Sequence, residues 1–209
     1  MTHLRSTSSS DARFSGVFAS PIRQQLKRAT ADLHRRLESG LHLLGPDLSP
    51  DRYRQTLECF FGFYAPIETA IARVASAGSA LGLPLRARTE LLENDLLSLG
   101  LSSREIADLP RCAELPRLSC RGELAGCLYV LEGACLGGRV IAPVLRDRLG
   151  VTEGSGASFF IGDGDGTQAR WQVFLAWLEG LVEAGAPLDE MVISARATFL
   201  AFALWVERA

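Results

Sequence analysis

The sequence predicts an all-α protein folded as a single domain. Apolar residues recur at spacings of three and four along most of the chain, which is the period of an amphipathic helix, and strand-like alternation is rare. Serine and proline precede several of these segments and glycine follows them, as is typical of helix starts and ends. A chain of 209 residues can bury one sizeable core, whereas two domains sharing this length would be very small.

The N-terminal segment is expected to lie outside this domain. Residues 1–19 are rich in serine and contain no apolar run long enough for a secretory signal peptide. The sequence therefore predicts a flexible tail at residues 1–19 and one helical domain at residues 20–209.

Two helices open the domain. The first is predicted from Pro21, a residue favoured in a first turn, to Ser39, where a glycine follows. The run Ser49-Pro50-Asp51 supplies a cap, a first-turn proline and an acidic residue, and so predicts the start of a second helix. This helix is expected to reach about Ser76, with a kink at Pro66.

The rest of the chain alternates helices and connections. Ser119 is predicted to cap a long glycine-bearing helix that Pro143 bends and that ends near Leu149. Connections are expected at residues 77–84, 110–116 and 150–166. The remaining helices are predicted at about residues 85–98, 102–108, 167–184 and 188–207.

Composition excludes several classes of protein. A formal net charge of −2 leaves no excess of basic side chains to hold a nucleic-acid backbone. The odd cysteine count of five, with no C-x-x-C pair, favours a reducing compartment, so a cytoplasmic protein is expected. Glu123, Glu132 and Arg139 interrupt the most apolar helix, which argues against membrane insertion.

The glycines of the long helix share one face. Each glycine inside a helix costs roughly 0.8–1.0 kcal/mol relative to alanine, so a cluster of them needs a reason. Gly126, Gly133 and Gly137 are seven and four residues apart and bare a strip of backbone on one side, next to Gly138. Two readings stay open, a close helix–helix crossing and a surface against a flat ligand.

The first helix carries a second pattern. Lys27, Ala31, His34 and Glu38 follow one another at spacings of four, three and four, and so form one stripe. Taken singly, the histidine and glutamate are more often a structural residue and half of a surface charge pair. Together, an imidazole can bind iron while a carboxylate one turn away orients it. The lysine lies ~10 Å further along the axis, a suitable offset for a propionate of haem. His42 lies about 80° round the helix and is not the expected ligand.

Four segments carry a family resemblance. Residues 26–38 (LKRATADLHRRLE) resemble the proximal-helix signature of haem oxygenases, and residues 129–138 (YVLEGACLGG) resemble their distal helix in its bacterial form. Residues 91–100 and 197–199 are similar to further blocks of the same family. The resemblance extends over about residues 21–207.

The resemblance implies a fold in which haem lies between the first helix and the glycine-bearing helix. His34 would be the proximal iron ligand, with Glu38 behind it, and Lys27 and Tyr129 would hold the propionates. The other residues expected at the haem are Ala31, Gly133, Ala134, Gly137, Gly138 and Phe199.

The activity implied is the oxidative opening of haem to biliverdin, carbon monoxide and ferrous iron. Haem b would be both substrate and cofactor, oxygen the oxidant, and an external reductase or ferredoxin the electron donor, with a phytochrome as a biliverdin acceptor. A haem-binding carrier or sensor on the same fold is the alternative, and a thiaminase-like hydrolase with a cysteine nucleophile is a third reading. The chain departs from many animal members of the family at Ala134, where they have an aspartate, and it offers only Arg170 where relatives place basic residues over a propionate.

Overall fold

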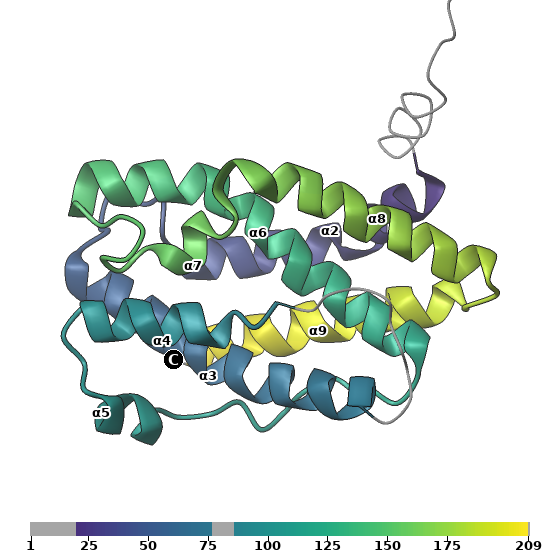
Figure 1. Cartoon of the computed structure of the whole chain (residues 1–209), viewed down its shortest axis with the longest axis horizontal. Helices are drawn as coiled ribbons and strands as arrows, with labels where there is room; N and C mark the ends of the chain where they lie inside the picture. The colour runs from purple at the N-terminus through teal and green to yellow at the C-terminus, as the bar shows by residue number, and fades with distance from the viewer. Residues whose placement is uncertain (1–19, 77–85, 209) are drawn as a thin grey trace, which may run out of the picture.

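The computed structural model describes residues 20–76 and 86–208, and within these ranges it contains helices and no strand (Figure 1). The all-α prediction is confirmed. The tail at residues 1–19 and the connection at residues 77–84 lie outside the described residues. The elements are α2 (Pro21–Leu41), α3 (Pro50–Ser76), α4 (Thr89–Ser98), α5 (Ser103–Asp108), α6 (Arg121–Leu149), α7 (Ser158–Ile161), the 3-10 turn η1 (Gly164–Gly166), α8 (Thr167–Glu183) and α9 (Leu188–Arg208).

The first helix begins as predicted and ends later. The Ser20 hydroxyl accepts a hydrogen bond from the Arg23 amide at 3.3 Å, and Pro21 occupies the first turn. The helix passes Gly40 and ends where His42 takes a left-handed conformation, with φ of 50°. The prediction of an end at Ser39 was wrong because a non-glycine residue supplies the cap that glycine usually supplies.

The long helix α6 is capped one residue later than predicted. The Cys120 sulfur, not the Ser119 hydroxyl, accepts from the Glu123 amide, at 3.4 Å. Ser119 instead donates through its backbone amide and hydroxyl to the Glu123 carboxylate, at 2.6 and 2.7 Å. The helix continues past Pro143 to Leu149.

The predicted loop at residues 150–166 contains the short helix α7. Asp95 of α4 accepts hydrogen bonds from the amides of Ser158 and Phe159, both at 2.8 Å, and so satisfies two of the free N–H groups of the first turn. This carboxylate lies more than sixty residues away in the sequence, so local pattern could not reveal the helix.

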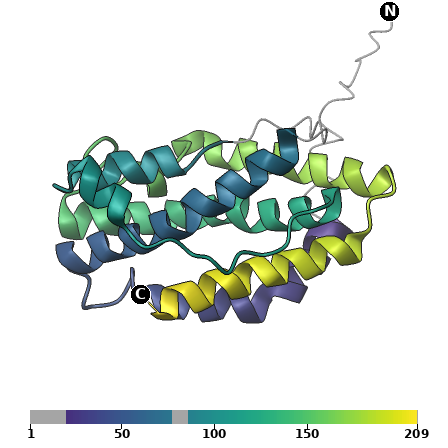
Figure 2. The same cartoon turned by 90° about the horizontal axis from the view of Figure 1, so that it is seen from below.

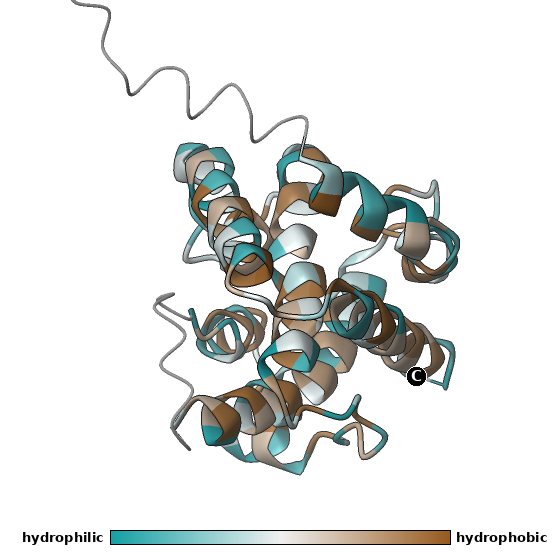
Figure 3. Cartoon of the chain, turned by 90° about the vertical axis from the view of Figure 1, so that its right-hand side faces the viewer, coloured by the Kyte–Doolittle hydropathy of each residue, from teal (hydrophilic) through white to brown (hydrophobic). Residues whose placement is uncertain are grey.

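Helices α2 and α6 both pack along α9. Along α6, Gly122 lies against Glu190 and Gly126 against Ala195 of α9. Along α2, Asp32 pairs with Arg196 and Arg36 with Glu207. Both helices therefore run in the same direction as α9. Figures 1 and 2 show α9 beside α2 in both views. The end view in Figure 3 shows helices that carry hydrophobic and hydrophilic residues together, as amphipathic helices do.

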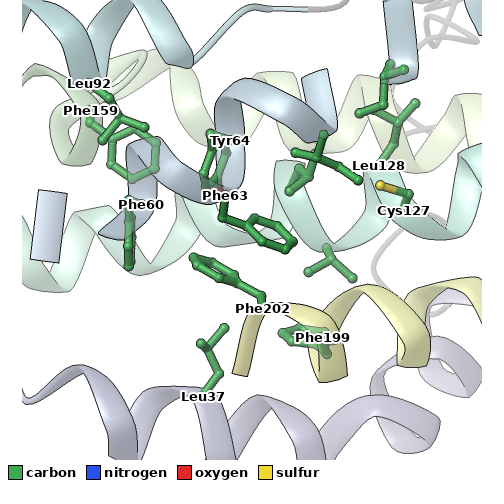
Figure 4. Close-up of a cluster of buried hydrophobic side chains, with 14 of the residues drawn as sticks. Leu37, Phe60, Phe63, Tyr64, Leu92, Cys127, Leu128, Phe159, Phe199 and Phe202 are labelled. Carbon is green, nitrogen blue, oxygen red and sulfur yellow. The ribbon is translucent and has the colours of Figure 1, made fainter. Parts of the chain in front are cut away.

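An aromatic cluster fills the core between α3, α7 and α9 (Figure 4). The Phe63 and Phe202 rings stack with centroids 4.3 Å apart, and Phe159 meets Tyr64 edge-on at 5.1 Å. All four side chains are buried. This core holds α3 and α9 together, and the glycine-bearing helix α6 packs against both.

Among the described helices, α6 is the one long and apolar enough to cross a membrane by length and composition. Glu123, Glu132 and Arg139 therefore do not by themselves exclude this helix from a membrane. Here α6 contacts α7, α8 and α9. Its central Glu132 is buried and paired with Arg170, with nitrogen and oxygen 3.0 Å apart. These are the surroundings of a core helix in a bundle.

Candidate functional site

The histidine of α2 lies on the helix surface, where a ligand can reach it. The His34 side chain is 53% exposed, and its Nδ1 lies 3.2 Å from a Glu38 carboxylate oxygen. The Phe199 ring of α9 meets the imidazole edge-on, with centroids 5.5 Å apart. The neutral tautomer that donates from Nδ1 to Glu38 keeps a free lone pair on Nε2. His34 is therefore oriented by two neighbours and can bind iron through Nε2.

Two ion pairs hold α2 on α9, on either side of this histidine. The Arg196 guanidinium contacts both oxygens of Asp32, at 2.9 and 3.1 Å. Arg36 pairs in the same forked way with Glu207, at 2.6 and 2.7 Å. Exposed pairs contribute little stability singly, but forked geometry fixes register. The position of His34 along α9 is thus set by the tertiary structure.

Lys27 and Ala31 share the face of His34. Lys27 is exposed and makes no hydrogen bond or ion pair with any residue that the structure describes, while Ala31 is half-buried. Seven residues separate Lys27 from His34, so the ammonium group lies nearly two turns before the imidazole. It is available to an anionic group at that end of the site.

Two glycines of the α6 strip are packing positions. A Cβ atom on Gly126 would overlap the Met191 carbonyl oxygen of α9, and one on Gly138 would overlap the Phe160 carbonyl oxygen of α7. Both are places where backbone approaches backbone, and no side chain fits there. The helix-crossing reading therefore holds for Gly126, and the structure does not bring Gly138 to the open face.

The other two glycines face free space. A Cβ on Gly137 would meet no described heavy atom within 4 Å, and one on Gly133 would meet only the Trp171 ring, at 3.7 Å. The neighbouring Ala134 and Val140 are exposed although the helix is apolar. An apolar, small-residue face left open in this way fits a flat ligand.

Tyr129 connects the two helices at one end of the open face. Its ring centroid lies 5.8 Å from that of Trp171. Burial raises the pKa of Tyr129, while a hydrogen bond to Thr30 and the charge of Arg23, both on α2, lower it. His34 follows Thr30 by four residues on α2, and Gly133 follows Tyr129 by four residues on α6. The histidine and the first glycine of the open face therefore each lie about one helical turn beyond Tyr129.

Arg170 does not reach the open face. Its guanidinium is bound to the Glu132 carboxylate at 3.0 and 3.1 Å and lies 3.7 Å from Asp163. Arg170, the one basic residue that the sequence offered near a propionate, is thus bound to a buried carboxylate of α6.

A second polar region behind α6 was not predicted. Tyr64, Arg88 and Glu132 line a cavity of about 180 Å³ between α3, α4 and α6. The one sequence signal was Glu132, a carboxylate between leucine and glycine in the most apolar helix. Tyr64 and Arg88 gave no signal because their partners come from distant segments.

The described residues contain no group of three or more metal-binding side chains, so a protein-bound metal cluster finds no support within them. Burial raises the pKa of Cys127 to about 12 and that of Cys135 to about 11. Such thiols are poor nucleophiles. The cysteine-hydrolase reading therefore loses its catalytic residue at these positions.

The arrangement fits haem. One oriented imidazole offers a single nitrogen ligand, as a haem iron requires from its proximal side. Gly137 supplies a face with no described side chain in the way, and at Gly133 the nearest side chain is the Trp171 ring, 3.7 Å from where a Cβ would lie. Lys27 supplies an unpaired cation near one end, where carboxylate groups can bind.

Comparisons with known proteins identify the family of this chain. The heme oxygenase family model matches residues 20–208. A "Heme oxygenase" of Xanthomonas campestris pv. campestris (strain 8004) is 32% identical over 157 residues, which is 74% of this chain and 88% of that protein. The chain therefore belongs to the haem oxygenase family and is an enzyme of haem degradation.

Proposed function

We propose that haem b binds between α2 and α6, with His34 on the iron and with Gly133 and Gly137 against the opposite face. The observation that carries this proposal is the contrast along α6. Gly126 and Gly138 are packed against backbone, whereas Gly137 has no described neighbour within 4 Å of its missing side chain. The open part of the helix is therefore the part that a ligand can cover.

On the proximal side, Glu38 and Phe199 set the direction of the imidazole. The Glu38 carboxylate lies 3.2 Å from Nδ1 and selects the tautomer in which Nε2 is the ligand atom. The edge-on contact with Phe199 limits rotation of the His34 imidazole. Glu38 is 64% exposed, so solvent screens its charge.

At the end of the site near Tyr129, Lys27 binds a propionate. The charge-assisted contact contributes roughly 1.5–3 kcal/mol, enough to favour one orientation of the ring. The Tyr129 hydroxyl, which lies near Thr30 and Arg23 of α2, gives a second polar contact at the same end. Ala31 leaves room for the ring between Lys27 and His34.

On the distal side, glycine backbone excludes bulky groups but admits a small molecule. Haem, when bound, supplies the iron that activates oxygen and the ring that is cleaved. Ala134 carries no carboxylate, so protons reach this face through water held by backbone groups. Ring opening yields biliverdin, carbon monoxide and ferrous iron. Electrons come from an external reductase or ferredoxin, the enzyme works in the cytoplasm, and a phytochrome is a suitable acceptor of the pigment.

Turnover distinguishes this enzyme from a carrier or sensor on the same fold. Purified protein is loaded with hemin and given ferredoxin, its reductase and NADPH under air, with catalase present to remove free peroxide. We expect the Soret band to fall as biliverdin accumulates, with carbon monoxide released in equal amount. Argon-equilibrated protein and free hemin with the same reductants are the controls. A Soret band that persists while electrons are consumed would identify a carrier or sensor.

A further inference from the structure

The cavity behind α6 lies on the opposite side of that helix from the open glycine face. Leu128 and Leu131, which line it, point away from Gly133 by the helical period. Figure 4 labels Tyr64 and Leu128, which reach this region from α3 and α6. The cavity volume of about 180 Å³ greatly exceeds the ~30 Å³ share of one water. It can hold a small organic molecule.

Two buried polar side chains in this cavity have no hydrogen-bond partner. Arg88 is 4% exposed, and neither its Nη1 nor its Nη2 makes a hydrogen bond. The Tyr64 hydroxyl, on a residue that is 1% exposed, is equally without a partner. Buried groups of these kinds are almost always bonded, and an isolated buried charge is costly. Both therefore indicate an absent partner that accepts hydrogen bonds.

The nearby carboxylates are already occupied. Glu68 accepts from the Arg88 amide at 2.6 Å and from the Thr89 amide and hydroxyl at 3.1 and 2.7 Å, so it serves the start of α4. Glu132 is held by the fork of Arg170.

The third carboxylate is Asp163. One of its oxygens pairs with Arg86, and the other lies 3.8 Å from the Arg88 guanidinium, too far for a hydrogen bond. The Arg86, Arg88 and Arg170 guanidinium groups thus lie among the carboxylates of Glu68, Glu132 and Asp163, and the ion pair of Arg88 with Asp163 leaves both Arg88 terminal nitrogens without a hydrogen bond.

We propose that this cavity is a binding site for a small organic monocarboxylate. The carboxylate accepts from the Arg88 guanidinium and the Tyr64 hydroxyl, and the apolar part of the ligand lies against Ile71, Leu128 and Leu131. The apolar walls favour an organic acid over an inorganic anion, because an inorganic ion would leave them uncovered. This site lies on the side of α6 away from Gly133 and Gly137, and the proposal does not depend on the proposed function.

Benzoate and acetate are the probes, measured by isothermal titration calorimetry on the haem-free and the hemin-loaded protein. Both forms are expected to bind one benzoate with equal affinity, and acetate is expected to bind more weakly because it covers less apolar surface. Arg88→Gln is expected to weaken benzoate binding by about tenfold or more, since it removes a charge-assisted contact. Tyr64→Phe is expected to weaken binding less, because a neutral donor is lost.

Arg104→Gln, which changes an exposed arginine on α5, is the matched control and should bind like the parent. Arg88→Gln removes a buried charge that makes no hydrogen bond through its terminal nitrogens and is expected to fold, and Tyr64→Phe provides an independent test if it does not. Three results would overturn the site. The first is that benzoate shows no saturable binding, which means that water fills the cavity. The second is that binding is lost when hemin is loaded, which means that benzoate occupies the haem cleft. The third is that the folded variants bind benzoate as the parent does.

Discussion

Gly137→Ala separates a ligand-facing glycine from a packing glycine. A Cβ at this position meets no described atom within 4 Å, so the substitution adds a methyl group without a clash. Removing a glycine from a helix interior stabilises the fold by up to about 1 kcal/mol. For a domain of this size, that gain raises the melting temperature by about 2–4 °C.

The other glycines of the same helix provide matched controls of opposite sign. Gly126→Ala forces a methyl group onto the Met191 carbonyl, and Gly138→Ala forces one onto the Phe160 carbonyl. Neither backbone segment can move without shifting a packed helix, so each variant should lose roughly 1–3 kcal/mol or more. The same chemical change is thus expected to stabilise at one position and destabilise at two others.

The assay combines melting with turnover. The haem-free Gly137→Ala variant should melt higher than the parent and still bind hemin through His34. Its biliverdin yield per electron consumed should fall, because the methyl group takes space that oxygen and its proton-donating water need. A raised melting temperature together with the parent's yield would refute the placement of Gly137 at the haem, whatever the enzyme class.

Three further predictions test other parts of the structure. His34→Ala should lose the histidine-ligated haem spectrum and most turnover, and added imidazole should restore part of both. The control variant His42→Ala should behave like the parent. An unchanged spectrum in His34→Ala would show that His34 is not the iron ligand. Lys27→Ala should weaken hemin affinity by about tenfold or alter the ratio of biliverdin isomers, read by chromatography, and Tyr129→Phe should do so less; if neither changes, the propionates lie elsewhere. Asp95→Ala should cost roughly 2–4 kcal/mol in urea unfolding, because two amide donors of α7, one buried and one part-buried, lose their acceptor. A cost near zero would show that α7 does not depend on this cap.

Several features followed from local sequence because their causes are local. The helical period, the proline and serine at the start of α2 and the arginine-rich surface of that helix depend on neighbours within a few residues. The stripe of Lys27, His34 and Glu38 is of the same kind, and the His34–Glu38 contact forms between residues one turn apart.

Other features depended on residues far apart in the chain. The helix α7 exists in a stretch that looks like a loop because Asp95 caps it. Arg170 turns away from the site because Glu132 holds it. The neighbours of Arg88 and Tyr64 around the cavity come from segments far apart in the sequence, so their environment has no local pattern.

The sequence by itself determined the helices, the shared face of the glycines and the stripe around His34, since each follows from a period of 3.6 residues. It could not decide which glycines pack and which stay open, because Gly126 and Gly137 lie on the same side of one helix. That depends on where α9 crosses α6 and where it moves away. Only the tertiary structure fixes that point, and it thereby leaves Gly137 without a described neighbour within 4 Å and Gly133 with the Trp171 ring alone.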